Sequence, residues 1–319
     1  MTTACAAGID AGKSYLDVGL APSRRHFRVA NKREGIEHIV DRLHEAGIAK
    51  VVLEAIGPYA QPLVTRLVAA GFEVGVVNPR RIKAFREAEG RTAKTDRLDA
   101  ALIARFAVKM TDALRPVPSA DQQFLKAIAT RRRQLVEMIA MEKTRLKQCV
   151  EPFLCESHRM TIATLTAERR RIEADLEGRL AADPKQLRQR AILQSLPGFG
   201  AAVSTTLITD MPELGTLDRR AAASLAGVAP HPSQSGTGPS RNEIAGGRPC
   251  VRTAVYMAAL SAIRCDPRFK AEYQAMREAG KPAKVAIIAI ARKLIVLANA
   301  LLKSDALYDP KHDGAIHAP

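Results

Sequence analysis

The sequence contains no tryptophan, and aromatic residues make up only 4% of its 319 residues. Proteins that hold single strands by stacking bases need many aromatic rings, so this composition favours nucleic-acid binding through phosphates and shape. The five cysteines show no C-x-x-C spacing and indicate a reducing compartment. The seven histidines include no H-x-x-x-H pair, which argues against a structural zinc site.

Long hydrophobic runs are also missing. No apolar stretch approaches the roughly 20 residues that span a bilayer. Val285–Leu302 comes closest, but Arg292 and Lys293 interrupt it. The N-terminus has no basic segment followed by an apolar one, so it does not resemble a signal peptide. We therefore expect a cytoplasmic protein with no membrane contact.

Positive charge is abundant. Lysine and arginine number 49 against 33 aspartates and glutamates, which gives a formal charge of +16 and a pI near 10.0. An excess of this size indicates a polyanionic partner, because each phosphate contact releases counterions. Hydrophobic residues make up 47% of the chain, which predicts a folded protein with room for two or three domains.

Four carboxylates stand at the ends of expected strands or at a helix start. Asp10 and Glu54 each close a short apolar run, and Asp96 and Asp99 share one face at the head of a helical segment. Carboxylates gathered in one place repel one another unless a cation lies between them. Two Mg²⁺ or Mn²⁺ ions, about 3.5–4 Å apart, would supply that charge and catalyse displacement at phosphorus.

The order of expected strands and helices in residues 1–115 predicts a mixed α/β layer. The expected strands are Cys5–Ile9, Tyr15–Leu20, His26–Ala30, Lys50–Leu53 and Phe72–Val77, and the expected helices are Glu34–Ala46, Gln61–Ala70, Arg80–Glu89 and Arg97–Lys109. This order resembles the ribonuclease-H-like fold, a resemblance that places the first and fourth strands side by side. Asp10 and Glu54 would then be neighbours.

Residues 116–185 predict a helical hairpin of the coiled-coil type, after a proline-bounded linker at Arg115–Pro118. Apolar residues recur by threes and fours from Leu125, and Arg132 and Glu142 interrupt the seam. A second long helix ends near Asp183. The arginine-rich runs of these helices would either face solvent or contact nucleic acid or a second subunit.

Residues 186–319 predict a mostly helical domain. The segment Leu193–Gly200 resembles the turn of a helix-hairpin-helix element, in which Gly198 and Gly200 permit a tight bend and the next helix start binds a phosphate. The alternative is an ordinary turn between two helices.

A loop rich in serine, glycine and proline follows at His231–Ser240. Three arginines follow its serines and are candidate nucleic-acid contacts: Arg241, Arg248 and Arg252. Arginines can stabilise a phosphate under attack, so a serine nucleophile is chemically reasonable here. This reasoning does not choose among Ser233, Ser235 and Ser240.

Taken together, the motifs resemble those of the bacterial insertion-sequence transposases of the DEDD type. That family has a RuvC-like N-terminal domain and includes pilin-gene invertases. The resemblance extends over essentially the whole chain. The segments that carry it are Gly8-Ile9-Asp10 with Lys13, Glu54, Lys94-Thr95-Asp96-Arg97-Leu98-Asp99-Ala100, Leu196-Pro197-Gly198-Phe199-Gly200, Leu225-Ala226-Gly227 through Pro230, and Gln234-Ser235-Gly236.

The resemblance implies roles for individual residues. The four acids would bind metal, and Ser235 would form a covalent phosphoserine link to DNA. It further implies a site that combines the serine of one protomer with the acids of another, and guidance by a structured RNA that the element encodes. Lys13 and Lys94, beside the acids, would steer the DNA backbone.

The favoured hypothesis is therefore a DNA transposase or recombinase of an insertion sequence. It would act as a dimer or tetramer in the bacterial cytoplasm, associated with the nucleoid. Two alternatives remain at this stage. One is a Holliday-junction-type nuclease in which metal-activated water attacks the phosphate, and the other is a nucleic-acid-binding protein whose acids are structural.

Overall fold

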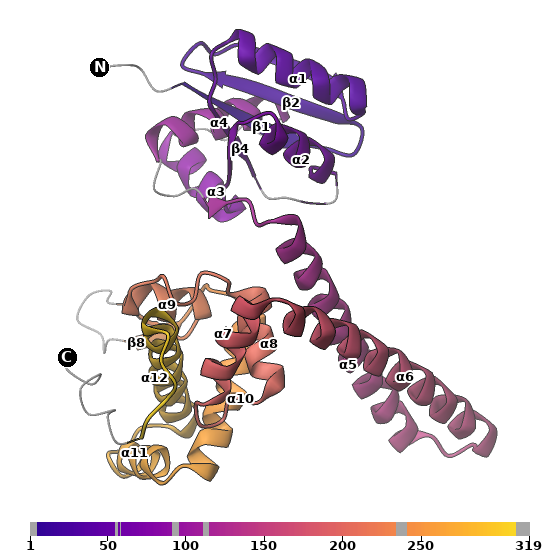
Figure 1. The fold of residues 1–319 in the computed structure, drawn as a ribbon, viewed down its shortest axis with the longest axis vertical. Coiled ribbons are helices and arrows are strands. Elements are labelled where there is room, and N and C mark those ends of the chain that lie inside the picture. The colour runs from indigo at the N-terminus through magenta and orange to yellow at the C-terminus, as the bar shows by residue number, and fades with distance from the viewer. Residues whose placement is uncertain are drawn as a thin grey trace. The chain divides into compact units, whose positions relative to one another are not determined.

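The computed structural model describes residues 5–54, 57, 59–90, 96–110, 115–233 and 241–310. The chain divides into two compact units, residues 1–119 and 120–319 (Figure 1). The first unit contains a sheet with helices on both faces, and the second is almost entirely helical.

The sheet of the first unit has six strands in the order β3-β2-β1-β4-β5-β6. Their bounds are β1 (Ala6–Ala11), β2 (Tyr15–Ala21), β3 (His26–Ala30), β4 (Lys50–Leu53), β5 (Glu73–Val76) and β6 (Arg115–Pro116). β1, β2 and β3 form an antiparallel meander, while β4 and β5 run parallel to β1. The predicted pairing of the first and fourth strands is confirmed.

The expected linker at 115–118 needs a correction, because its first two residues form a strand. Arg115 and Pro116 pair antiparallel with Val76 and Gly75 at the edge of the sheet. An edge position suits proline, which has no N–H to offer a further strand. Pro116 therefore belongs to the sheet's last strand, and the first unit ends just after it, at residue 119.

Side chains alternate between the two faces of the sheet. Ile9, Leu16 and Leu53 pack in one cluster with α1 and α2, whereas Ala6 and Val52 pack on the other face with α3 and α4. The helix bounds are α1 (Arg33–Glu45), α2 (Gln61–Ala69), α3 (Pro79–Ala88) and α4 (Asp96–Lys109). This period-two division follows from strand geometry and makes three layers.

Two glycines let α4 lie directly on the sheet. A Cβ added at Gly8 would stand 2.2 Å from the backbone nitrogen of Ala104 and 2.4 Å from the carbonyl oxygen of Ala100. A Cβ at Gly19, the cross-strand partner of Gly8, would stand 2.6 Å from the nitrogen of Ala101. Backbone therefore meets backbone here, and only glycine fits at these two strand positions.

The second unit begins with the helical hairpin α5 (Ala120–Gln148) and α6 (Pro152–Ala182). Arg132 and Glu142, which were expected to interrupt the apolar seam of α5, each pair with a residue of α6. Arg132 Nε donates to Glu173 Oε1 at 2.8 Å, and Glu142 Oε2 lies 2.7 Å from His158 Nδ1. Because these pairs join early α5 to late α6 and late α5 to early α6, the helices run antiparallel.

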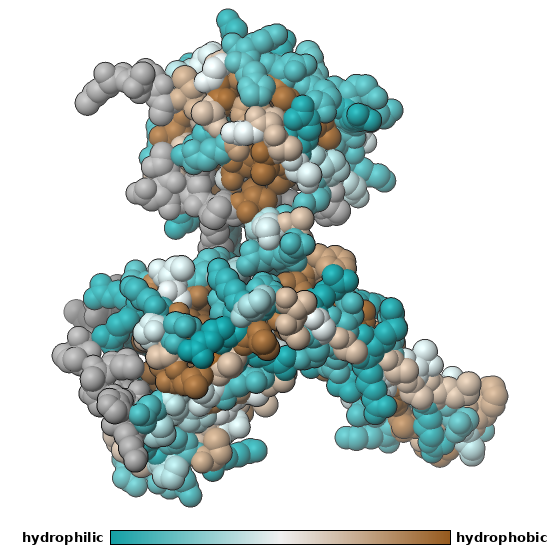
Figure 2. All heavy atoms as spheres, viewed as in Figure 1, coloured by the Kyte–Doolittle hydropathy of each residue, from teal (hydrophilic) through white to brown (hydrophobic). Residues whose placement is uncertain are grey.

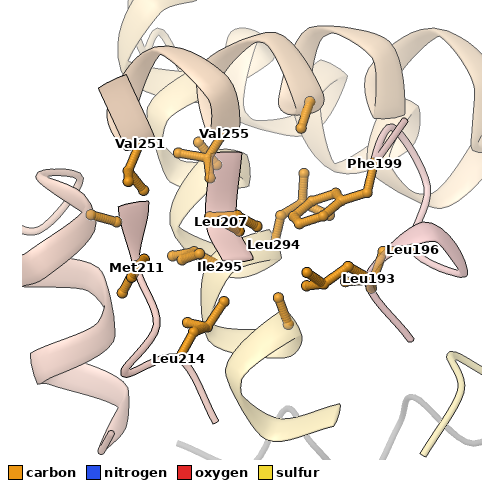
Figure 3. Packing of buried hydrophobic residues seen from close by; sticks show 14 of the residues in the cluster. Leu193, Leu196, Phe199, Leu207, Met211, Leu214, Val251, Val255, Leu294 and Ile295 are labelled. Atoms are coloured by element: carbon orange, nitrogen blue, oxygen red, sulfur yellow. The ribbon is translucent and has the colours of Figure 1, made fainter. Parts of the chain in front are cut away.

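Six more helices and a two-stranded sheet complete the described part of this unit. Their bounds are α7 (Pro184–Gln194), α8 (Ala201–Asp210), α9 (Arg219–Ala226), β7 (Pro230–Ser233), β8 (Arg241–Ile244), α10 (Pro249–Cys265), α11 (Pro267–Glu278) and α12 (Ala283–Ser304). Figure 3 shows Leu207 of α8 close to Leu294 and Ile295 of α12 within a single core.

Helix α12 is the centre of that core. Among the described residues it is the one helix long and apolar enough to cross a membrane, with a mean hydropathy of 2.2. Its Ile290, Leu294 and Ile295 are fully buried against the other helices of the unit. The apolar run noted in the sequence is therefore accounted for by packing within the protein.

Candidate active site

Asp10 and Glu54 lie at the carboxyl ends of adjacent parallel strands. Ile9 of β1 pairs with Leu53 of β4, and each acid follows its member of that pair. Asp10 shares its sheet face with Gly8, and Glu54 shares its face with Val52; both are on the side that α4 covers. Neighbouring strands are about 4.8 Å apart, so the two acids lie close together. Both side chains are half-buried.

The first turn of α4 comes to the same end of the sheet. Gly8 lies against Ala100, whereas Ala6, two residues earlier in β1, packs in the cluster that contains Phe106. Helix α4 therefore runs antiparallel to β1, and its beginning faces the end of the strand that bears Asp10.

The structure describes the side chain of only one of the two acids of α4. Asp96 is the first residue of the helix, and its side chain lies outside the described part. Asp99 is buried, with 5% exposure, and Arg86 of α3 donates from Nη2 to its Oδ1 at 2.5 Å. Among the described side chains, no three Asp, Glu, His or Cys lie together as a metal-binding group. The donors themselves are carboxylate oxygens, the ligands that Mg²⁺ and Mn²⁺ prefer.

Arg86, which lies beside Asp99, was not among the residues predicted from the sequence. Its contact with Asp99 leads to a prediction about stability. Replacing Arg86 by glutamine should lower the free energy of unfolding by about 3–5 kcal/mol, because it leaves the carboxylate of Asp99 buried without its cation. Denaturant unfolding measures this, with exposed Arg81 on the same helix as the matched control. Equal stability of the Arg86→Gln and Arg81→Gln variants would contradict the prediction.

Asp17 is a second residue near the site that the sequence reasoning missed. It lies directly opposite Asp10 across the β1–β2 ladder and is 3% exposed. His26 Nε2 lies 2.9 Å from its Oδ1, and Arg28 Nε donates to both oxygens at 3.0 and 3.1 Å. An aspartate between apolar neighbours in a strand was the available signal. These partners compensate its charge, so Asp17 supports the site without adding a free carboxylate.

Of the two lysines predicted to steer phosphates, the structure describes only Lys13. Lys13 is exposed in the turn between β1 and β2, close in sequence to Asp10. Lys94 lies outside the described residues. Steering by either lysine stays a prediction.

The predicted tight turn of the second unit is present between α7 and α8. Gly198 has a positive φ of 81°, and a Cβ there would meet the carbonyl oxygen of Ala258 in α10 at 2.2 Å. Gly200 is the N-cap of α8, and Phe199 between them is buried. Gly198 thus has a packing reason of its own, and phosphate binding at Gly198 and Gly200 stays a prediction.

The serine-bearing segment lies between two paired strands. Ser233 closes β7 and pairs with Arg241 of β8. The side chains of both residues lie outside the described part, and so do Ser235 and Ser240 altogether. The structure therefore places the ends of the loop and leaves the choice of serine open.

The two other predicted DNA-binding arginines have partners within the protein. Arg248 donates from Nη1 and Nη2 to the carboxylate of Glu213 at 2.7 and 2.6 Å. Arg252 donates from Nε to the carbonyl of Gly227 at 2.8 Å and from Nη2 to the carbonyl of Gly246. Arg252 thus joins the segments that enter and leave the β7–β8 hairpin, and Arg248 joins the segment after the hairpin to the connection between α8 and α9, so both have a positioning role. Direct contact of either arginine with nucleic acid stays a prediction.

A buried aspartate anchors the helical hairpin to the rest of the second unit. Asp210 is 4% exposed, and Arg133 of α5 donates to its Oδ2 at 2.5 Å. Arg248 donates to the carbonyl of Asp210 at 2.6 Å. Burial, followed by the nearby charge of Asp210, raises the pKa of the Cys250 thiol, so the sulfur stays protonated and unreactive. Arg132 and Arg133 therefore form ion pairs within the protein, whereas the sequence led us to expect solvent, nucleic acid or a second subunit beside this run.

Comparison with known proteins identifies the class. The IS110 DEDD model, described as a transposase, matches residues 7–154. A model described as transposase of the IS116/IS110/IS902 family matches residues 190–274. The two matches fall on the acid-bearing sheet with its following helices and on the serine-bearing unit. Both models describe transposases, so the chain belongs to this class of proteins.

More specifically, the chain belongs to the IS110/IS116/IS902 family of insertion-sequence transposases, so the family that its motifs resembled is confirmed. The pilin gene-inverting protein of Moraxella bovis is 26% identical over 268 residues, 82% of each chain. The IS110 43.6 kDa protein of Streptomyces coelicolor is 30% identical over 155 residues, 47% of this chain and 37% of that protein. T. thermophilus RuvC in complex with a Holliday junction substrate has 18% identity and a TM-score of 0.29, covering 35% of this chain and 99% of that chain.

Proposed function

We propose that this chain cuts and rejoins the DNA of an insertion sequence by using metal-binding acids and a serine nucleophile. The observation that carries the proposal is the position of Asp10 and Glu54, side by side at the ends of β1 and β4 under the first turn of α4. Membership of a transposase family and the charge of +16 support DNA as the substrate.

Asp10, Glu54, Asp96 and Asp99 would together hold divalent ions, Mg²⁺ or Mn²⁺, and two such ions would offset the charge of the gathered carboxylates. Such ions stabilise the negative charge that develops on a phosphate under attack. The strand ends orient the two carboxylates, which are half-buried and so stay accessible to an ion. Arg86 holds Asp99 in place at the start of α4.

Ser235 is the proposed nucleophile. Its Oγ forms a bond to phosphorus as the bond from phosphorus to the 3′ oxygen breaks, and the serine proton is transferred so that a 3′-hydroxyl leaves. The phosphoserine bond retains the energy of the broken phosphodiester, so reversal with a new 3′-hydroxyl rejoins the DNA. Arg252 would position the loop that bears the serine by binding a carbonyl on each side of the β7–β8 hairpin, and Arg248 would hold the segment that follows it.

We further propose a structured guide RNA encoded by the element, and assembly as a dimer or tetramer in which one protomer's serine works with another's acids. The RNA and the shared site follow from the family resemblance. Self-association has additional support at the turn of the α5–α6 hairpin, where Val150 is 92% exposed and Phe153 is 79% exposed. Figure 2 shows apolar surface gathered at this end of the hairpin. Apolar side chains exposed in this way are typical of interaction surfaces.

A trapping assay tests the proposal. The protein is incubated with DNA of the element end, the RNA encoded beside it and Mg²⁺, and the reaction is quenched in denaturant. We expect a covalent protein–DNA adduct, with the modified peptide at Ser235 by mass spectrometry and no adduct in Ser235→Ala. The matched controls are Ser233→Ala and Ser240→Ala, which should both still form it.

The other outcomes have defined meanings. An adduct that persists in Ser235→Ala and disappears in one of the control variants moves the nucleophile to that serine. Cleavage without any adduct replaces the serine mechanism by attack of water. Binding without either product, with the RNA present, removes the catalytic proposal.

A further inference from the structure

Tyr15 places an aromatic ring at the rim of the acid site. It begins β2 and lies two residues before Asp17, so both side chains are on the same face of the sheet. Asp17 is the cross-strand partner of Asp10, which makes Tyr15 the diagonal neighbour of Asp10 on that face. Its side chain is 53% exposed.

The position of the ring is well defined. The nitrogen of Gly12 donates to the carbonyl of Tyr15 at 3.0 Å and closes the turn between β1 and β2. The guanidinium carbon of Arg28 lies 5.6 Å from the centre of the ring, and Arg28 is itself bound to buried Asp17. Tyr15 is therefore an exposed ring held beside a fixed positive charge, in contrast to a mobile surface side chain.

A second exposed tyrosine belongs to the same rim. Asn31 donates from Nδ2 to the carbonyl of Gly12 and to the carbonyl of Tyr59, both at 2.9 Å. One side chain thus ties the turn after β1 to the segment after β4, the two places where Asp10 and Glu54 stand. Among the phenylalanines and tyrosines described in the first unit, only Tyr15 and Tyr59 are exposed.

We propose that Tyr15 is a stacking platform for a base of the DNA strand whose phosphate enters the site at Asp10 and Glu54. This inference rests on the proposed function and adds a contact that orients the substrate. A base ring stacks on an aromatic face irrespective of its identity, and the guanidinium of Arg28 beside Tyr15 holds that ring in place. In a chain so poor in aromatics, exposed rings beside the acids indicate a binding role for this rim.

The chain has no tryptophan, so Tyr15→Trp introduces a single fluorescent reporter at the platform. The full-length variant is titrated with unlabelled mixed-sequence single-stranded DNA in Ca²⁺ and about 0.3 M salt, where phosphate attraction is reduced. We expect stacking to quench its emission by about half or more at saturation. The matched control is Val68→Trp, on α2 at the opposite face of the sheet and equally exposed at 53%, whose emission should stay constant.

Two substitutions measure the contribution of the ring. Tyr15→Ala should weaken the affinity for the same strand about 5- to 100-fold, whereas Tyr15→Phe keeps the ring and should stay within about twofold. Thermal unfolding of each variant checks that the fold is intact. An unchanged affinity in Tyr15→Ala, or an unquenched Tyr15→Trp while anisotropy of a labelled strand reports binding, would overturn the proposal.

These titrations are separate from the chemistry. Quenching that persists when no covalent adduct forms retains the platform and removes the serine mechanism. An adduct without quenching removes the platform and retains the serine mechanism. Quenching by RNA of the same sequence, and not by DNA, overturns the assignment of the strand as DNA.

Discussion

Replacement of Asp10 by asparagine is expected to slow DNA cleavage by about a thousandfold or more while DNA affinity stays within about twofold. Asparagine keeps the shape of the side chain and removes the charge that would hold a divalent ion. The affinity persists because it depends on the many basic residues that contact phosphates. Cleavage rates under single-turnover conditions and anisotropy with labelled DNA provide the two measurements.

The control for this variant is Asp41→Asn, an exposed aspartate on α1, which lies on the opposite face of the sheet. It should leave both measurements unchanged. Glu54→Gln should behave as Asp10→Asn does, because the two acids stand at paired strand ends. Chelation of divalent ions with EDTA should abolish wild-type cleavage. A cleavage rate in Asp10→Asn equal to that of the wild type would remove the metal-site proposal.

The second large effect concerns the fold. Replacement of Gly8 by alanine should destabilise the first unit by about 3 kcal/mol or more, because the new Cβ overlaps backbone atoms of α4 that no side-chain rotation can move. The helix must shift away from β1, and it carries Asp96 and Asp99 with it. Denaturant unfolding of the full chain measures the loss of stability, and cleavage should fall with it.

Gly57→Ala is the appropriate comparison for this change. Gly57 belongs to the same unit, and a Cβ added there meets nothing within 4 Å. It should leave the unfolding transition of the first unit close to that of the wild type. If Gly8→Ala and Gly57→Ala unfold at the same denaturant concentration, α4 does not rest on the sheet in the way that the structure describes.

The strands of the first unit were predictable because their apolar residues alternate or run continuously between turn residues. His26–Ala30 and Lys50–Leu53 were predicted with the bounds that the structure has. The edge strand at Arg115 was missed because Pro116 and Pro118 are typical of a linker, and two residues carry no periodicity. The local sequence pattern therefore predicts strands well, and it predicts the pairing of a short edge strand poorly.

The acids could be selected from sequence because their strand-end positions are a local property. Their partners could not, because Arg86 and Asp99 meet only when α3 packs against α4. The same holds for Arg248, whose partner Glu213 lies 35 residues away in the chain. A basic residue near a glycine-rich loop resembles a DNA contact until folding shows which carbonyl or carboxylate it binds.

Helix α12 has a consequence for how the protein is made. The sheet of the first unit and its helices are complete once residue 119 has been synthesised, so this unit can fold while translation continues. The core of the second unit cannot close until α12 has left the ribosome, because Leu294 and Ile295 fill its centre. A chain stopped before Ala283 would carry a folded acid-bearing sheet and an open apolar core, the kind of surface that proteases and chaperones recognise. The second unit can therefore complete its fold only after α12 has been synthesised.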